Sequence, residues 1–273
     1  MNSKKKRAEI PRFTTPIVET HCHLDYLKAQ ALPETLARAE QAGVSRIVTI
    51  AVSPDNLQRV RELAATHSKV WGTQGIHPHE AASYDAAVAQ AVREGMQADC
   101  IVAVGEIGLD YYYEHADRHT QRQVFEAQLA LAAELDMPVV IHTREADDDT
   151  RDILRNYSGT LARKGVIHSF TSSLALAEFC LGEGFSLGFN GIATFNRADN
   201  VREVVRATPV DRLLLETDAP YLTPVPYRGK ENAPCYLPFI AQCVAQVKGL
   251  EAEDLLAHAY RNSMALFFND TVN

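Results

Sequence analysis

Short apolar runs rich in valine, isoleucine and leucine recur along the chain at fairly even spacing. Runs of this length without polar alternation predict strands that are buried on both faces, as in a parallel sheet. Eight can be read from the sequence, at residues 17–21, 46–52, 70–76, 101–107, 138–143, 165–170, 185–191 and 212–218. The pattern of apolar and polar positions therefore predicts eight strands.

Amphipathic stretches that predict helices separate these runs. In the clearest, residues 122–135, one apolar stripe at helical spacing is formed by Phe125, Leu129, Ala132 and Ala133. Alternating strands and helices are typical of right-handed βαβ units with a parallel sheet. Eight such units in 273 residues match the size of a (β/α)8 TIM barrel, an α/β fold. A doubly wound open sheet is the alternative, but the even spacing of the strands favours a closed barrel.

The chain reads as one domain with a short leading segment. No stretch rich in glycine and serine and no change in composition divides it, so we expect a single barrel domain over residues 17–270. We expect residues 1–16 to form a flexible tail, whose basic run from Lys4 to Arg7 fits a solvated tail better than a nucleic-acid arm. Residues 220–234 form a long irregular stretch, and such loops in compact domains are usually functional.

Composition and charge restrict the classes of function. The chain has 27 Lys and Arg against 35 Asp and Glu, a net charge of −8, so its surface as a whole does not attract nucleic acid. An anionic substrate would need a local positive site, such as bound metal ions. The five scattered cysteines form no C-x-x-C pair, which is typical of reduced thiols in a cytoplasmic protein. We find no membrane-spanning run, no secretory signal and no sign of an obligate protein partner.

Polar residues occupy the carboxyl ends of five predicted strands. Active sites of TIM barrels lie at these ends, where the loops that follow the strands meet. The residues are His21 and His23 at the first strand, Glu106 at the fourth, His142 at the fifth, His168 at the sixth and Asp218 at the eighth. Closure of the barrel would bring four imidazoles and two carboxylates to one mouth.

The spacing in the segment ETHCHLD supports a metal site. Side chains on a strand alternate between faces, so His21 and His23 point the same way and Cys22 points away. The same rule places Glu216 on the face of Asp218. Each histidine alone also fits a hydrogen-bonded core residue, but six such groups are costly to bury together without compensation. Two divalent cations would supply it, so the set predicts a binuclear metal centre.

Other polar residues near the mouth are candidates for substrate binding. His77 in GIHPH follows the third strand and could contact substrate or a further ion, or only stabilise its loop. Arg144 shares the face of the histidine on the fifth strand and could bind a phosphate, with an ion pair to Asp147 as the alternative. Arg228 and Lys230 could hold phosphates from the long loop or form an ordinary surface pair.

Two further stretches have less definite interpretations. His79 fits a surface loop residue. In GEIGLDYYY, Asp110 could orient a ligand or cap a turn, and the three tyrosines, Tyr111, Tyr112 and Tyr113, could stack on a base or cover the barrel top. The sequence has no Walker loop, no G-x-G-x-x-G and no G-x-S-x-G motif.

A series of motifs, in order along the chain, resembles the TatD family of metal-dependent deoxyribonucleases, within the amidohydrolase-like barrels. The motifs are THCHLD, GIHPH, GEIGLDYYY, PVVIHTR, VIHSF, LLLETDAPYLTPVPYRGKEN and YRNSMALF. The resemblance runs from about Ile17 to about Phe268 and leaves out the basic tail.

The resemblance implies a role for each residue at the predicted mouth. The implied ligand set is His21 and His23 for one ion, His142 and His168 for a second, Glu106 as the bridge, and Asp218 as both ligand and general base. The two divalent ions would be Mg²⁺, Mn²⁺ or Zn²⁺. Members of the family are typically cytoplasmic 3′-to-5′ exonucleases, to which roles in DNA repair are attributed. The implied substrate is therefore DNA, at 3′ ends or as single strands, although a related lineage removes D-amino acids from tRNA.

Three hypotheses for the function follow. The first is hydrolysis of DNA phosphodiester bonds by a water activated at the metal site, with Glu106 and Asp218 as catalytic residues. The second keeps the site and changes the bond, giving a D-aminoacyl-tRNA deacylase or another amidohydrolase or esterase. The third is a non-catalytic metal-binding scaffold, and the complete ligand set argues against it.

Overall fold

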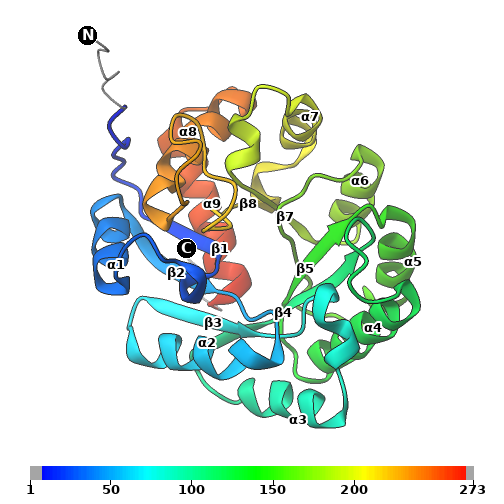
Figure 1. Cartoon of the computed structure of the whole chain (residues 1–273). Helices are drawn as coiled ribbons and strands as arrows, with labels where there is room; N and C mark the ends of the chain where they lie inside the picture. Colours follow the sequence, from blue (N-terminus) through cyan, green and yellow to red (C-terminus); the bar gives the residue numbers. More distant parts are fainter. Residues whose placement is uncertain (1–7, 269–273) are drawn as a thin grey trace.

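The computed structural model describes residues 8–268, and Figure 1 shows its strands enclosed by helices. The strands are β1 (Ile17–Cys22), β2 (Val44–Thr49), β3 (Val70–Gln74), β4 (Ile101–Asp110), β5 (Val139–Arg144), β6 (Gly165–Ile167), β7 (Ser186–Phe189) and β8 (Leu213–Leu215). The α-helices are α1 (Leu32–Gln41), α2 (Pro54–Thr66), α3 (Ala86–Gly95), α4 (Arg118–Glu134), α5 (Asp147–Tyr157), α6 (Leu174–Gly182), α7 (Asp199–Ala207), α8 (Leu237–Lys248) and α9 (Ala252–Phe267). Short 3₁₀ helices in the connections are η1 (Leu24–Tyr26), η2 (Pro78–Ser83), η3 (Gly191–Thr194), η4 (Val210–Arg212) and η5 (Pro234–Tyr236).

Each strand pairs in parallel with the next strand along the chain, from β1 to β8. The predicted (β/α)8 barrel is thereby confirmed, with all eight of its strands. Their ends differ from the prediction: β4 is longer and reaches Asp110, whereas β6 and β8 are shorter. His168 and Asp218 therefore lie in the loops that follow these two strands. Within residues 8–268, every helix is too short or too polar to span a membrane.

Neighbouring strand residues contribute to two separate apolar layers. Ile141 packs in the large cluster that the strands share with the helices, whereas Val140 belongs to a second cluster. Other strands contribute Val48, Val102, Val166 and Leu214 to this second cluster. Because side chains alternate along a strand, His142 shares the inner face of Val140 and lies one step nearer the carboxyl end. The fold thus places the histidine inside the barrel, above an apolar floor.

Side chains and loop backbone close the barrel between β1 and β8. Oε1 of the fully buried Glu19 carboxyl group accepts hydrogen bonds from the backbone N–H of His21 at 3.1 Å and of Thr217 at 2.8 Å. The N–H of Asp218 donates to the His21 carbonyl at 2.9 Å. Burial raises the pKa of Glu19 to about 8, against the opposing effect of its hydrogen bonds. This closure places the histidines of β1 beside the carboxylate that follows β8.

The segment before β1 is attached to the last helix. The Glu253 carboxylate in the first turn of α9 accepts hydrogen bonds from the backbone N–H of Thr14 at 2.7 Å and of Thr15 at 3.0 Å. The basic run of the predicted tail, Lys4 to Arg7, lies outside the described residues. The described part of this segment therefore has a fixed point on the barrel.

Replacing Glu253 by glutamine should lower the free energy of unfolding at neutral pH. Hydrogen bonds from Thr14 and Thr15 lower the pKa of the Glu253 carboxyl from 4.5 to about 2. A carboxyl with a lowered folded-state pKa stabilises the fold above its unfolded pKa and loses this contribution as pH falls through the folded value. The difference between wild type and Glu253→Gln in urea titrations should be constant above about pH 5 and shrink toward pH 2. An equal difference at pH 7 and pH 2 would contradict this account.

Candidate active site

All six residues predicted at the mouth come together at one end of the barrel. They are His21 at the end of β1, His23 directly after it, Glu106 in β4, His142 in β5, His168 after β6 and Asp218 after β8. Four of them are buried, whereas His142 and Asp218 are half-buried and face the opening. Strands far apart in the sequence thus supply one compact group.

Glu106 lies at the centre of this group. Its Oε1 lies 2.7 Å from His168 Nε2, 3.1 Å from His142 Nδ1 and 3.5 Å from His77 Nε2. Its Oε2 lies 3.5 Å from His21 Nε2. The two oxygens of one carboxylate therefore face different histidines, which is the arrangement a bridging ligand requires.

The histidines of β1 and Asp218 form the first half of the site. Asp218 Oδ1 lies 3.5 Å from His23 Nε2 and 3.7 Å from His21 Nε2. Between the two histidines, Cys22 turns the other way and places its Sγ 3.8 Å from the Val48 carbonyl oxygen in β2. The structure thus has the alternation expected for the H-C-H segment.

His142 and His168 form the second half. Nδ1 of His142 lies 3.3 Å from Nε2 of His168. The imidazole of His168 also stacks on that of His21, with 3.8 Å between the ring centroids, so the two halves are contiguous. Asp110, at the end of β4, holds the far side of the His142 ring, since its Oδ2 lies 3.0 Å from Nε2. This contact keeps Nδ1 of His142 directed at Glu106.

The charges in the group are strongly coupled. Burial raises the pKa of the Glu106 carboxyl, but the positive charge of the histidines around it, above all His168, holds that pKa well below its usual value. Burial lowers the pKa of His168, but Glu106 raises it well above the ordinary histidine value. A raised pKa favours the protonated form of His168 beside Glu106. The proton must leave before the nitrogen can bind a metal ion.

Several buried nitrogen and oxygen atoms of the group have no hydrogen-bond partner. They are Nδ1 and Nε2 of His21, Nδ1 of His23, Nδ1 of His168 and Oε2 of Glu216. Such orphaned atoms cost roughly 1–3 kcal/mol each unless something binds them. Three overlapping triads place their ligand atoms within 4.8 Å of one another: His21, His23 and Glu106; His77, Glu106 and His142; His21, His168 and Glu216. Imidazole and carboxylate donors suit divalent cations, so the group fits a divalent-metal site.

Comparison with known proteins identifies the family. A family model described as TatD related DNase matches residues 18–268. The chain belongs to this family. The 3′-5′ ssDNA/RNA exonuclease TatD of Erwinia amylovora is 39% identical over 240 residues, which cover 86% of this chain and 92% of the relative. The metal-dependent hydrolase YabD of Bacillus subtilis (strain 168) is 35% identical over 252 residues, covering 92% and 98% of the two chains.

A solved structure shares both the fold and the sequence similarity. The crystal structure of YjjV, a TatD homologue from Escherichia coli K12, matches with a TM-score of 0.87 and 31% identity. The match covers 92% of this chain and 97% of the YjjV chain. These relatives and the histidine–carboxylate cluster show that this TatD-family chain is a metal-dependent hydrolase acting on ester bonds and that it binds divalent metal.

The four residues considered for substrate binding have different surroundings in this TatD-family barrel. His77 lies against the central carboxylate, as described above, and Arg144 lies at the rim beside the second half of the site. Arg228 stacks on the ring of Phe195 at 4.0 Å, and Lys230 is exposed on the long loop. Within the described part of the chain, no hydrogen bond or ion pair joins the side chain of Arg228 or Lys230 to the metal-binding cluster.

Two further residues reach the site. Glu216 Oε1 lies 3.5 Å from His168 Nδ1, on the side of that ring away from Glu106. His79 lies in the connection after β3 and is partly exposed, as a surface loop residue should be, but its Nε2 also lies 3.1 Å from Asp110 Oδ2. His79 lies in the 3₁₀ helix η2, and a short local turn of this kind leaves no periodic pattern in the sequence.

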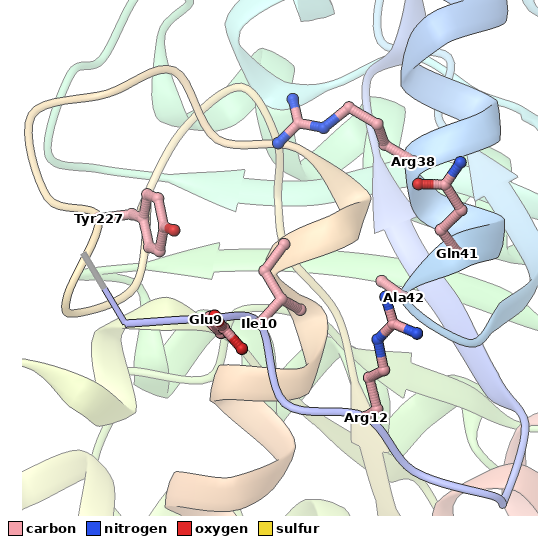
Figure 2. A pocket seen from close by; sticks show the side chains of 7 residues that line it. All are labelled: Glu9, Ile10, Arg12, Arg38, Gln41, Ala42 and Tyr227. Atoms are coloured by element: carbon pink, nitrogen blue, oxygen red, sulfur yellow. The ribbon is translucent and has the colours of Figure 1, made fainter. Parts of the chain in front are cut away.

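A surface cavity lies away from this cluster. It has a volume of about 350 Å³ and lies between the segment before β1, the end of α1 and the loop after β8 (Figure 2). Its lining residues are Glu9, Ile10, Arg12, Arg38, Gln41, Ala42 and Tyr227. None of the metal-site residues lines it, so we assign the chemistry to the barrel mouth.

Replacing Gly108 by alanine should destabilise the fold by about 3 kcal/mol. Gly108 in β4 has a φ of +136°, and a Cβ there would lie 1.9 Å from the carbonyl oxygen of His142. The side chain would therefore meet backbone that cannot move without displacing a histidine of the site. Urea unfolding measures the loss, with Gly182→Ala as the control, because a Cβ at Gly182 meets nothing within 4 Å. Equal stabilities of the two variants would contradict the argument.

Proposed function

We propose that this TatD-family enzyme hydrolyses DNA phosphodiester bonds and releases nucleotides from the 3′ ends of single strands. The observation that carries the proposal is the position of Glu106, whose two oxygens face two separate sets of histidines. A carboxylate so placed can bridge two divalent ions, which we take to be Mg²⁺, Mn²⁺ or Zn²⁺. The similarity to the Erwinia relative, named a 3′-5′ ssDNA/RNA exonuclease, supports the same substrate class.

The side chains of the mouth have distinct roles in this proposal. Bound divalent ions would supply positive charge for the phosphate and lower the pKa of a water molecule. His21, His23, His142 and His168 would hold them, with Glu106 between the two pairs. Two ions would add a local charge of +4, which compensates for the net charge of −8 that would otherwise repel DNA.

Asp218 is the general base of the proposal. Burial raises the pKa of its carboxyl, but the proximity of His23 and the charge of the other histidines outweigh this effect and hold the pKa below its usual value. Asp218 is therefore ionised at neutral pH, as an acceptor for the proton of the attacking water must be. Its half-buried position keeps one side of the carboxylate open to the mouth.

A single-stranded oligonucleotide labelled at its 5′ end tests the proposal. With Mn²⁺ or Mg²⁺ the enzyme should shorten it in steps of one nucleotide from the 3′ end, and a strand whose last linkages are phosphorothioates should resist. If no DNA is cleaved with any of the three ions while a D-aminoacyl-tRNA is hydrolysed, the enzyme is a deacylase and the proposal is wrong.

A further inference from the structure

The loop after β4 presents two tyrosines to solvent beside the metal site. Tyr112 is 53% exposed and Tyr113 is 52% exposed. The preceding residue, Tyr111, is buried, and its hydroxyl donates to Asp149. Within residues 8–268, large exposed hydrophobic side chains occur at Tyr112, Tyr113, Tyr221 and Val225, all in the loops after β4 and β8. Exposed aromatic rings concentrated at the mouth indicate a surface that contacts a ligand.

Arg144 at the end of β5 completes this surface. Its guanidinium carbon lies 4.0 Å from the ring centroid of Tyr112 and 4.9 Å from that of Tyr113. The two rings are perpendicular, with centroids 4.8 Å apart. The predicted alternative, an ion pair with Asp147, is absent: within the described chain no carboxylate oxygen lies within 4.0 Å of the guanidinium nitrogens. We call Tyr112, Tyr113 and Arg144 the aromatic shelf.

One carboxylate fixes the aromatic shelf to the metal site. Asp110 Oδ1 accepts hydrogen bonds from the backbone N–H groups of Tyr112 and Tyr113, each at 3.0 Å. The other oxygen of Asp110 holds the ring of His142, as described above. Arg144 also lies two residues after His142, on the same face of β5, so its Cα is about 7 Å further along the strand. The shelf is therefore adjacent to the site where phosphodiester hydrolysis would occur.

We infer that the aromatic shelf binds one unpaired nucleotide next to the bond that is cleaved. This inference rests on the proposed nuclease function and assigns the residues that hold its substrate. The tyrosine rings stack on the base, which every base permits because each has a π-face. The guanidinium of Arg144, without a carboxylate partner, binds the neighbouring phosphate. In a duplex a base must be unpaired and unstacked before it can stack on the tyrosines, so the aromatic shelf favours single strands.

Binding of DNA can be measured separately from cleavage. Fluorescence anisotropy of a labelled oligothymidylate, with the full chain and Ca²⁺, gives the Kd of wild type and variants. The double variant Tyr112→Ala/Tyr113→Ala should raise Kd for the single strand about tenfold or more, and Tyr112→Phe/Tyr113→Phe should restore binding because the rings remain. Kd for a blunt duplex should change less than twofold, or about 0.4 kcal/mol. An unchanged Kd for the single strand would overturn the inference.

Arg144→Gln tests the phosphate contact. Loss of one phosphate contact should reduce the slope of log K against log salt by about 0.7 for a single strand. The matched control is Arg59→Gln, which removes an exposed arginine of α2 and should leave the slope unchanged. Equal slopes for all three proteins would overturn this part of the inference.

Kinetics separate the two proposals. If wild type cleaves DNA with Mn²⁺, the alanine double variant should show a raised KM with kcat within about twofold, and turnover of methyl 4-nitrophenyl phosphate, which has no base, should be unchanged. A proportionate loss on both substrates would show damage to the metal site and refute the assignment of the shelf. If wild type binds oligothymidylate through the shelf but cleaves no DNA, the nuclease proposal fails and the binding inference stands.

Discussion

Replacement of Glu106 by glutamine should lower kcat/KM for hydrolysis about a thousandfold and weaken binding of divalent ions. Glu106 contacts histidines of both halves of the site. Its shortest distance to them is 2.7 Å, from Oε1 to Nε2 of His168. A neutral amide retains the shape of the side chain but has lost the negative charge, and its NH₂ group cannot donate electrons to a cation. Metal content after dialysis and turnover of a 3′-labelled single strand measure the two effects.

A matched control tests whether the effect is specific to Glu106. Glu178→Gln makes the same chemical change at an exposed position of α6, away from the mouth. It should retain wild-type metal content and turnover. If Glu106→Gln cleaves DNA as fast as this control, the activity does not arise from the described site.

Replacement of Asp218 by asparagine should lower kcat about a thousandfold, within the range typical of a lost general base. Because its pKa lies below the usual value, Asp218 is ionised across the neutral range and contributes no pH dependence there in the wild type. Without a base, hydroxide from solution must replace it, so kcat of the variant should rise about tenfold per pH unit between about pH 7 and 9. The wild type should change much less over this interval.

The metal content of Asp218→Asn distinguishes the loss of a general base from the loss of a metal ligand. Asp218→Asn should retain most of its bound metal if the histidines and Glu106 provide the main binding energy. Asp211→Asn, an exposed change in η4 before β8, is the control and should leave kcat unaltered. A variant whose kcat falls but does not rise with pH would contradict the role of Asp218 as base.

The fold and the central residues could be predicted because both depend on simple periodic patterns. Buried parallel strands read as apolar runs, and a barrel closes those runs around one mouth, so residues at strand ends meet. Glu106 is the exception, because it lies at an irregularity in the pairing of β4 with β5, between Gly105 and Ile107, where the period of two does not apply. Spacing alone put His21 and His23 on one face, and His142 lies two residues after the inward-facing Val140 on the same strand. For these residues, knowledge of the strand suffices to place the side chain.

The sequence could not place residues whose position depends on loop conformation. His79 contacts Asp110 from the 3₁₀ helix η2, whose position depends on the conformation of the connection after β3. Asp218 has a φ of +57°, so the backbone has left the strand and the period of two no longer applies between it and Glu216. The two carboxylates accordingly contact different histidines. The role of Glu19 in closing the barrel could not be predicted either, because its hydrogen bonds join β1 to a loop almost two hundred residues away.

The measurement that tests the central claim most directly is a crystal structure with Mn²⁺ and a short single-stranded oligonucleotide that is cleaved slowly. Anomalous scattering should show two ions, one held by His21, His23 and Glu106 and one held by Glu106, His142 and His168, with a phosphorus atom of the strand next to both. An absence of ions at this cluster, or an ester or amide carbon of another ligand in the place of phosphorus, would contradict the account.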